Sequence, residues 1–89
     1  MGIVPHFLDE EDPRPAREQF DEKYAHGGGW RPIKGFSLDE KDMVIRYPGD
    51  PPLRPVAMWR FRDEMILMYP YGLVMVVQPD STHEIARMD

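Results

Sequence analysis

The sequence predicts an α+β fold, in which one N-terminal helix packs on an antiparallel sheet of four or five strands. Between residues 13 and 26, apolar side chains recur every four positions, which is typical of one face of a helix. Between residues 56 and 78, side chains alternate between two faces and turn residues interrupt the run, which is typical of consecutive strands. A chain of 89 residues has the length of a single domain.

Residues 1–12 are expected to form an arm ahead of the helix. The apolar side chains of this arm lie between Ile3 and Leu8. They either dock on an uncovered face of the sheet or fray, since chain termini are often poorly ordered. The four acids at residues 9–12 indicate the start of a helix, because negative charge opposes the positive end of the helix dipole.

The helix is expected over residues 13–26. Asp12 can cap its N-terminus, and Pro13 suits the first helical position, where an N–H has no partner within the helix. Three glycines follow His26 and end the helix, because glycine readily adopts the left-handed conformation of a C-cap. The narrow apolar stripe of the helix consists of Ala16, Phe20 and Tyr24.

The sheet is expected over residues 33–88. It begins with a hairpin, whose strands are residues 34–38 and 43–47 and whose loop is residues 39–42. A proline-rich segment, residues 48–55, then leads to the central strands. This segment is either a stiff connector or a polyproline ligand of the type that SH3 domains bind.

The first turn of the central strands is expected at Asp63-Glu64. This turn places Phe61 opposite Ile66 on an apolar face of the sheet. We expect this face to pack against the helix. The predicted main core consists of Phe20, Tyr24, Trp59, Phe61, Ile66, Met68, Val74 and Val76.

The second turn is expected at residues 70–72, where proline fixes φ and glycine permits a positive φ. A three-residue loop at this point pairs Met68 with Val74. Residues 83–88 then alternate again and form a last strand. We expect this strand at an edge of the sheet, where its charged side chains discourage aggregation.

The opposite face of the central strands is also apolar, although a sheet with one solvated face would alternate apolar and polar positions. The single helix can cover only one face. The candidate interaction surface is therefore the second face, which consists of Met65, Leu67, Tyr69, Leu73, Met75 and Val77. Either a second copy of the chain buries this surface in a symmetric homodimer, or the arm and the hairpin fold over it.

The composition excludes several classes of protein. The chain has no cysteine, which excludes disulfides, thiol catalysis and cysteine-based zinc sites and favours a cytoplasmic location. The longest apolar run, residues 65–77, is shorter than the ~20 residues of a membrane-spanning helix, so we expect no membrane partner. A net charge of -5 is opposite to the basic footprint of nucleic-acid-binding domains, so we expect no nucleic acid partner.

The sequence motifs predict neither a catalytic residue nor a cofactor. Residues 26–30, HGGGW, contain the oxyanion-hole motif of some esterases, but the chain lacks the nucleophile motif that this chemistry requires. The histidines His6, His26 and His83 lie far apart in the sequence and show no helical metal-binding spacing. We therefore expect no metal ligand.

Three stretches, AHGGGWRPIKGF, RYPGDPPLRP and VVQPDSTHEIARMD, resemble small uncharacterised proteins that phages of actinobacteria encode. The resemblance covers most of residues 16–89. It implies a phage accessory protein in the cytoplasm of a bacterial host, and it carries over no activity and no functional residue.

We expect a non-enzymatic protein-interaction factor, because apolar sheet surface is present while catalytic motifs are missing. The seven methionines agree with this expectation, since methionine is flexible and common on adaptable binding surfaces. The resemblance makes a host bacterial protein the expected partner. Two alternatives are a small enzyme or metal-dependent factor with a site near His26 or His83, and a minor structural component of a phage particle.

Overall fold

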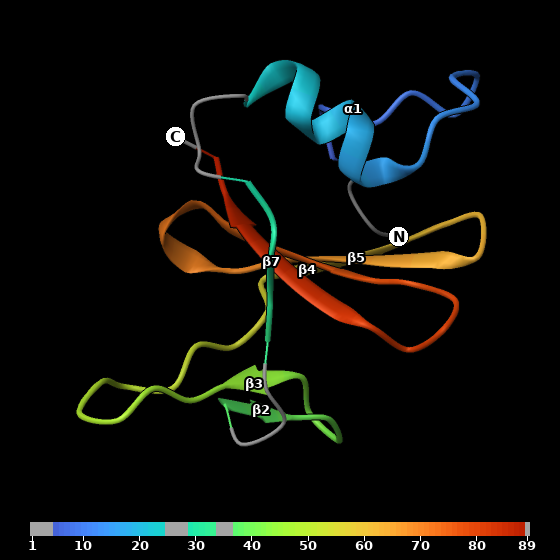
Figure 1. Cartoon of the computed structure of the whole chain (residues 1–89). Helices are drawn as coiled ribbons and strands as arrows, with labels where there is room; N and C mark the ends of the chain where they lie inside the picture. Colours follow the sequence, from blue (N-terminus) through green and yellow to red (C-terminus); the bar gives the residue numbers. More distant parts are fainter. Residues whose placement is uncertain (1–4, 25–28, 34–36, 89) are drawn as a thin grey trace.

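The computed structural model of the chain describes residues 5–24, 29–33 and 37–88. Its elements are α1 (Ala16–Lys23), β1 (Arg31–Pro32), β2 (Leu38–Asp39), β3 (Val44–Ile45), β4 (Ala57–Phe61), β5 (Glu64–Met68), the 3₁₀ turn Pro70–Gly72, β6 (Leu73–Val77) and β7 (His83–Arg87). Five strands form an antiparallel sheet in the order β1-β7-β6-β5-β4, and β2 pairs with β3. In Figure 1, α1 lies over one face of the large sheet, and the β2–β3 hairpin lies on the opposite side. The expected α+β architecture is confirmed.

The helix α1 is shorter than expected at its N-terminus, and Asp12 does not cap it. Pro15 occupies the N-cap position with φ of -59° and ψ of 158°, and as the N-cap residue it provides no side-chain cap. A proline disfavours helical geometry in the preceding residue, so Arg14 stays outside the helix. The Asp12 carboxylate instead accepts the Arg14 backbone N–H at 2.9 Å and pairs with its guanidinium at 2.7 Å. The hydrogen bonds from the Arg14 side chain and backbone lower the pKa of Asp12 to about 2.

The C-terminus of α1 is also earlier than expected. The helix ends at Lys23, and the backbone N–H of Tyr24 closes its last turn on the carbonyl of Phe20 at 2.9 Å. Residues 25–28 lie outside the described residues, so His26 and the first two glycines of the expected helix end are not placed.

The first face of the sheet packs under α1 and holds the predicted main core. All eight predicted core residues belong to this cluster, with Phe20, Phe61, Ile66, Val74 and Val76 buried and Tyr24, Trp59 and Met68 partly buried. Full burial of each apolar side chain of this size stabilises the fold by roughly 1.5–3 kcal/mol relative to exposure. The core assignment from strand alternation and helix periodicity is therefore confirmed.

The described part of the arm also packs into this first cluster, which corrects the expectation that it docks on the uncovered second face. Phe7 is 2% exposed and Leu8 is 9% exposed. The rings of Phe7 and Phe20 meet edge-on, with their centroids 5.2 Å apart. The physical reason is the narrow stripe of α1, which leaves apolar sheet surface beside it for another segment to cover.

The turn between β4 and β5 lies at Arg62-Asp63, one position before the expected turn. The two strands pair Phe61 with Glu64 and Trp59 with Ile66, which corrects the expected register by two residues. Because strand side chains alternate with a period of two, this displacement leaves every residue on its expected face. The face assignment is therefore right although the register is wrong.

Contacts with the N-terminal segment fix this turn. Arg62 adopts a positive φ of 58°. Its guanidinium donates to the carbonyl oxygens of Glu10 at 3.0 Å and Arg14 at 3.1 Å, and also to that of Asp12. These partners are about 50 residues away in the sequence, so no local pattern indicates them.

The second turn of the central strands is confirmed, and the last strand is not at an edge. Met68 pairs with Val74 across the turn Pro70–Gly72. The strand β7 lies between β6 and β1, which corrects its expected edge position. The chain before Pro32 is extended, as residues before proline prefer, and it pairs with β7.

The hairpin β2–β3 covers the middle of the second face. Leu38 and Ile45 are buried against the sheet. Leu38 pairs with Ile45, whereas the expected loop of residues 39–42 would pair it with Met43, so the expected register is wrong by two residues. Leu53 of the proline-rich segment pairs with Ile45 through hydrogen bonds of 2.8 and 2.9 Å, which form an isolated antiparallel bridge beside β3. The phenol of Tyr69 donates to the carbonyl oxygen of Met43 at 2.7 Å. Residues 34–36 of the expected first strand lie outside the described residues.

Candidate functional site

The structure buries most of the predicted interaction surface within one chain. Leu67, Tyr69, Leu73 and Met75 are buried beneath the β2–β3 hairpin and its continuation, whereas Met65 and Val77 remain partly exposed. The expectation of an uncovered face is therefore wrong, and the intramolecular alternative describes this face. The hairpin is narrower than the sheet, however, and a cleft stays open at each end of the second face.

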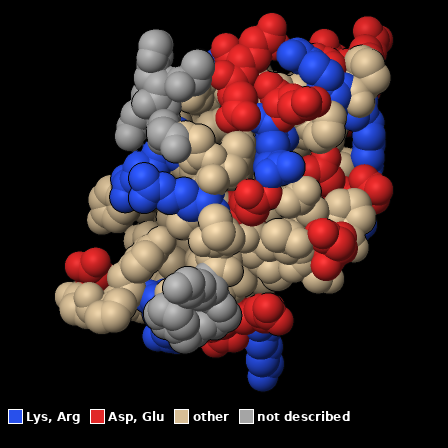
Figure 2. Space-filling view, viewed as in Figure 1, with Lys and Arg blue, Asp and Glu red and all other residues tan. Residues whose placement is uncertain are grey.

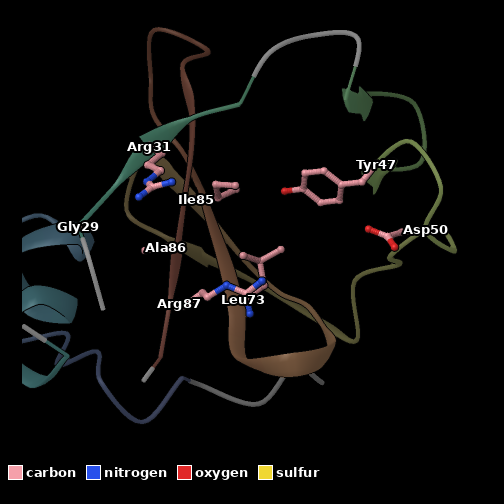
Figure 3. Close-up of a pocket in the computed structure, with 8 residues that line it drawn as sticks. All are labelled: Gly29, Arg31, Tyr47, Asp50, Leu73, Ile85, Ala86 and Arg87. Carbon is pink, nitrogen blue, oxygen red and sulfur yellow. The ribbon is translucent and has the colours of Figure 1, made fainter. Parts of the chain in front are cut away.

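The first opening, which we call the arginine cleft, has a volume of about 390 Å³. Its lining residues are Gly29, Arg31, Tyr47, Asp50, Leu73, Ile85, Ala86 and Arg87. In Figure 3, the Tyr47 ring extends from the proline-rich side toward Ile85, while Arg31 and Arg87 lie on the far side. The cleft therefore has one basic wall and one wall formed by a phenol and a carboxylate.

Sheet pairing brings the two arginines of this cleft together. Arg31 of β1 lies opposite Ile85 of β7, and Arg87 follows Ile85 by two residues on the same face of β7. Arg87 in turn lies opposite Leu73 of β6. The two guanidinium groups thus flank an apolar floor formed by Ile85 and Leu73.

Neither arginine of the cleft is neutralised within the described part of the chain. The ion pairs found there belong to Arg14 and Arg17, which bind acids near α1 and on β7. Arg31 and Arg87 are both exposed. They form a local basic site on a chain whose net charge is -5.

The proline-rich segment forms the opposite wall of the arginine cleft. The backbone N–H of Asp50 donates to the carbonyl of Tyr47 at 3.1 Å, which closes a turn. Gly49 in this turn has a φ of 84°, a conformation that glycine adopts without strain. The segment therefore positions Tyr47 and Asp50 at the cleft. Pro52 and Arg54, which lie between them and β4, are exposed, so the connector and the polyproline ligand both stay predictions.

A pair of guanidinium groups over an apolar floor can bind an anion and an adjacent apolar group. Guanidinium is planar and matches a carboxylate with two parallel hydrogen bonds. It does not lose its proton in proteins, so these two side chains supply binding and charge but no acid–base step.

The second opening, the methionine cleft, has a volume of about 350 Å³. It is lined by Glu40, Met43, Met58, Met65, Leu67, Val77, Ser81 and His83. Cross-strand pairing places Met65 beside Val77, and Val77 beside His83. Met58 on β4 is 54% exposed, so this cleft presents flexible apolar side chains at the surface.

Of the two histidines near which the alternative function would have its site, only His83 is among the described residues. His83 lines the methionine cleft, but Glu84 points to the other face of β7, where its carboxylate accepts from Arg17 and from Gln78 at 2.6 Å. No group of three or more His, Asp or Glu side chains with metal-binding geometry occurs among residues 5–24, 29–33 and 37–88. His26 lies outside these ranges, while the Trp30 indole of the HGGGW segment donates to Asp21 at 3.0 Å.

The sequence prediction missed the arginine cleft. The alternation of residues 83–88 already places Ile85 and Arg87 on one face, which is the part that local pattern can reveal. The position of Arg31 depends on the pairing of β1 with β7, for which the two-residue strand gives no signal of its own.

The charged surface carries both signs. In Figure 2, acidic side chains gather over the layer that contains α1, and basic side chains lie among and below them. None of the helices in the described residues has the length and apolar character needed to cross a membrane. Comparison of the chain with models of protein families, with curated proteins and with solved structures finds no match.

Proposed function

We propose that the protein is a non-enzymatic binding protein, whose arginine cleft holds an acidic segment of a partner protein. The observation that carries this proposal is the pair Arg31 and Arg87, two guanidinium groups at the rim of one cleft that have no carboxylate partner among residues 5–24, 29–33 and 37–88. Arginine and tyrosine are, with tryptophan, the residue types enriched at the energetic centre of protein interfaces. The cleft combines both types with an apolar floor.

The walls of the cleft indicate the chemistry of the bound segment. A carboxylate of the partner pairs with the guanidinium groups, and a neighbouring apolar side chain rests on Leu73 and Ile85. Asp50 on the opposite wall repels a second carboxylate. The segment that fits best therefore has one acid followed by an apolar or aromatic residue.

The biological setting of the proposal comes from the resemblance to phage-encoded proteins. In that setting the partner is a protein of the bacterial host, and the encounter takes place in the host cytoplasm. A role as a minor component of a phage particle uses the same cleft with a phage protein as the partner.

The test begins with a randomised peptide display library selected on the immobilised full-length protein. We expect enriched peptides to carry Asp or Glu beside an apolar residue. A synthetic copy of an enriched peptide should lose about tenfold in affinity for Arg31→Ala and for Arg87→Ala, since a charge-assisted hydrogen bond contributes roughly 1.5–3 kcal/mol. Arg54→Ala removes the same charge from an exposed position outside the cleft and should leave the affinity unchanged.

Affinity capture from bacterial lysate with the same variants extends the test to whole proteins. We expect wild type and Arg54→Ala to capture a set of proteins that neither Arg31→Ala nor Arg87→Ala captures. Peptides without acids, or equal binding by all three arginine variants, would contradict it. Tight binding of inorganic phosphate that displaces the peptides would instead identify a small-anion site and overturn the protein-binding role.

A further inference from the structure

The two edge strands of the large sheet differ in how well they are protected against pairing with a further strand. At one edge, β1 has only two residues, and Pro32 lacks the N–H that a further strand would need. At the other edge, β4 has five residues, contains neither proline nor glycine, and is the last strand of the described sheet. A long edge strand presents a row of backbone donors and acceptors to another chain, and most proteins protect such an edge.

The side chains of β4 on the second face are exposed at this edge. Val56, just before the strand, is 70% exposed, and Met58 is 54% exposed. They are two of the three large apolar residues with high exposure in the described part of the chain. Arg60, the next residue on the same face, is also exposed. The edge therefore has an apolar end and a basic end.

We propose that β4 pairs antiparallel with β4 of a second copy of this chain and joins the two sheets into one continuous sheet. The two-fold axis passes at Trp59, the middle residue of β4, because this register alone overlaps all five residues of both strands. It sets Met58 opposite Arg60 of the second copy, and the symmetry repeats this contact once.

The charge pattern of the strand favours a second copy in this orientation. Antiparallel pairing covers each Met58 with the aliphatic stem of an arginine, whose guanidinium remains in water. Parallel pairing would place the two Arg60 side chains side by side, and like charges in neighbouring positions destabilise a sheet. The apolar and basic ends of one strand thus complement each other only when the second strand runs in reverse.

The pairing also completes the rim of the methionine cleft. Met58 lines that cleft, so Arg60 of the second copy lies at its rim in the assembled sheet. The homodimer that the sequence left as one of two alternatives is kept in this proposal, but its contact is the β4 edge, because the β2–β3 hairpin already occupies the second face. The pairing involves neither Arg31 nor Arg87, so it stands or falls independently of the proposed function.

A set of charge variants tests the pairing by sedimentation equilibrium over a range of micromolar concentrations. We expect wild type to dimerise. Met58→Lys places two lysines opposite two arginines and should weaken dimerisation by about tenfold or more. Met58→Glu makes an equally polar change at the same exposed position, yet it creates two ion pairs with Arg60 and should dimerise at least as tightly as wild type. The double variant Met58→Lys/Arg60→Glu restores opposite charges and should recover the dimer.

A cross-link tests the register independently. The chain has no cysteine, so the double variant Met58→Cys/Arg60→Cys places new thiols directly opposite each other across the axis. Oxidation should give covalent dimers with this variant and few with either single variant. A monomeric wild type, or Met58→Lys and Met58→Glu variants that dimerise equally, would overturn the proposal. Circular dichroism checks that each variant keeps the fold.

Discussion

The side-chain carboxylate of Glu64 accepts a hydrogen bond from the backbone N–H of Ala16 at 3.2 Å. Ala16 is the first residue of α1, whose own N-terminal residues provide no side-chain cap. Glu64 is the first residue of β5 and is only 8% exposed. A strand thus supplies the negative group that the start of the helix lacks, which couples the helix layer to the sheet.

Replacing Glu64 should therefore loosen α1. We expect Glu64→Ala to lower the free energy of unfolding by about 1–3 kcal/mol, because it leaves the Ala16 N–H without its acceptor. Glu64→Gln keeps an acceptor oxygen and should cost less than the alanine variant. Urea unfolding followed by circular dichroism measures both values, with the exposed Glu40→Ala as the control. Equal stability of Glu64→Ala and wild type would show that the desolvation of this carboxylate cancels the bond.

The two tryptophans should respond differently to substitution by phenylalanine. Both pack against the first-face core, but the Trp59 indole nitrogen is buried without a hydrogen-bond partner among the described residues, whereas that of Trp30 donates to Asp21. Trp59→Phe removes an unsatisfied donor together with some apolar area, so its cost should stay within about 1 kcal/mol. Trp30→Phe loses a made bond and should cost more than Trp59→Phe.

Trp59→Ala shows how much unfolding free energy the whole Trp59 side chain contributes, against which the loss in Trp59→Phe is compared. It leaves a cavity between β4 and the helix layer and should cost about 3 kcal/mol in urea unfolding. If Trp59→Phe destabilises the protein as much as Trp59→Ala does, the indole nitrogen has a partner in solution and the prediction fails.

Tyr69 should make the fold sensitive to alkaline pH. Burial under the hairpin raises the pKa of its phenol to about 12. The folded-state pKa then exceeds the unfolded-state value of about 10, so the unfolded chain releases this proton first as the pH rises. The stabilisation is fully present below about pH 10 and is lost as the pH rises toward 12.

The absorbance of tyrosinate near 295 nm follows this titration. We expect the last ionisation step of the folded protein to disappear in Tyr69→Phe and to remain in Tyr71→Phe, whose phenol is exposed at the turn after β5. The Tyr69→Phe variant should also keep more of its neutral-pH stability above pH 10 than wild type does. A last step that persists in Tyr69→Phe would assign it to another phenol.

Local sequence patterns correctly predicted which sides of α1, β4, β5 and β6 are buried. The spacing of four in α1 and the alternation in β4, β5 and β6 identified the main core, since one buried face imposes the same period on every residue of an element. Even the error of two residues in the β4–β5 register left the faces unchanged, because two is the period of a strand.

The errors concern features that distant residues decide. Pro15 delays the start of α1, but the group that serves the helix start comes from Glu64, which is far away in the sequence. The turn at Arg62 is held by hydrogen bonds to carbonyl oxygens of the N-terminal segment. The arm packs on the first face because the narrow apolar stripe of α1 leaves part of that face uncovered. Periodicity contains no information about such contacts.

The sequence by itself determined an α+β chain with two apolar sheet faces and one helix, because hydrophobic periodicity is a local property. Only the tertiary structure decided how the second face is covered. The β2–β3 hairpin folds back over that face, buries Leu67 and Met75, and leaves the arginine and methionine clefts at its two ends. The physical reason is that burying the same apolar surface within one chain or between two chains gives a similar hydrophobic gain, so the pattern alone does not distinguish them. The pairing of Leu53 with Ile45 helps to hold the hairpin in this position.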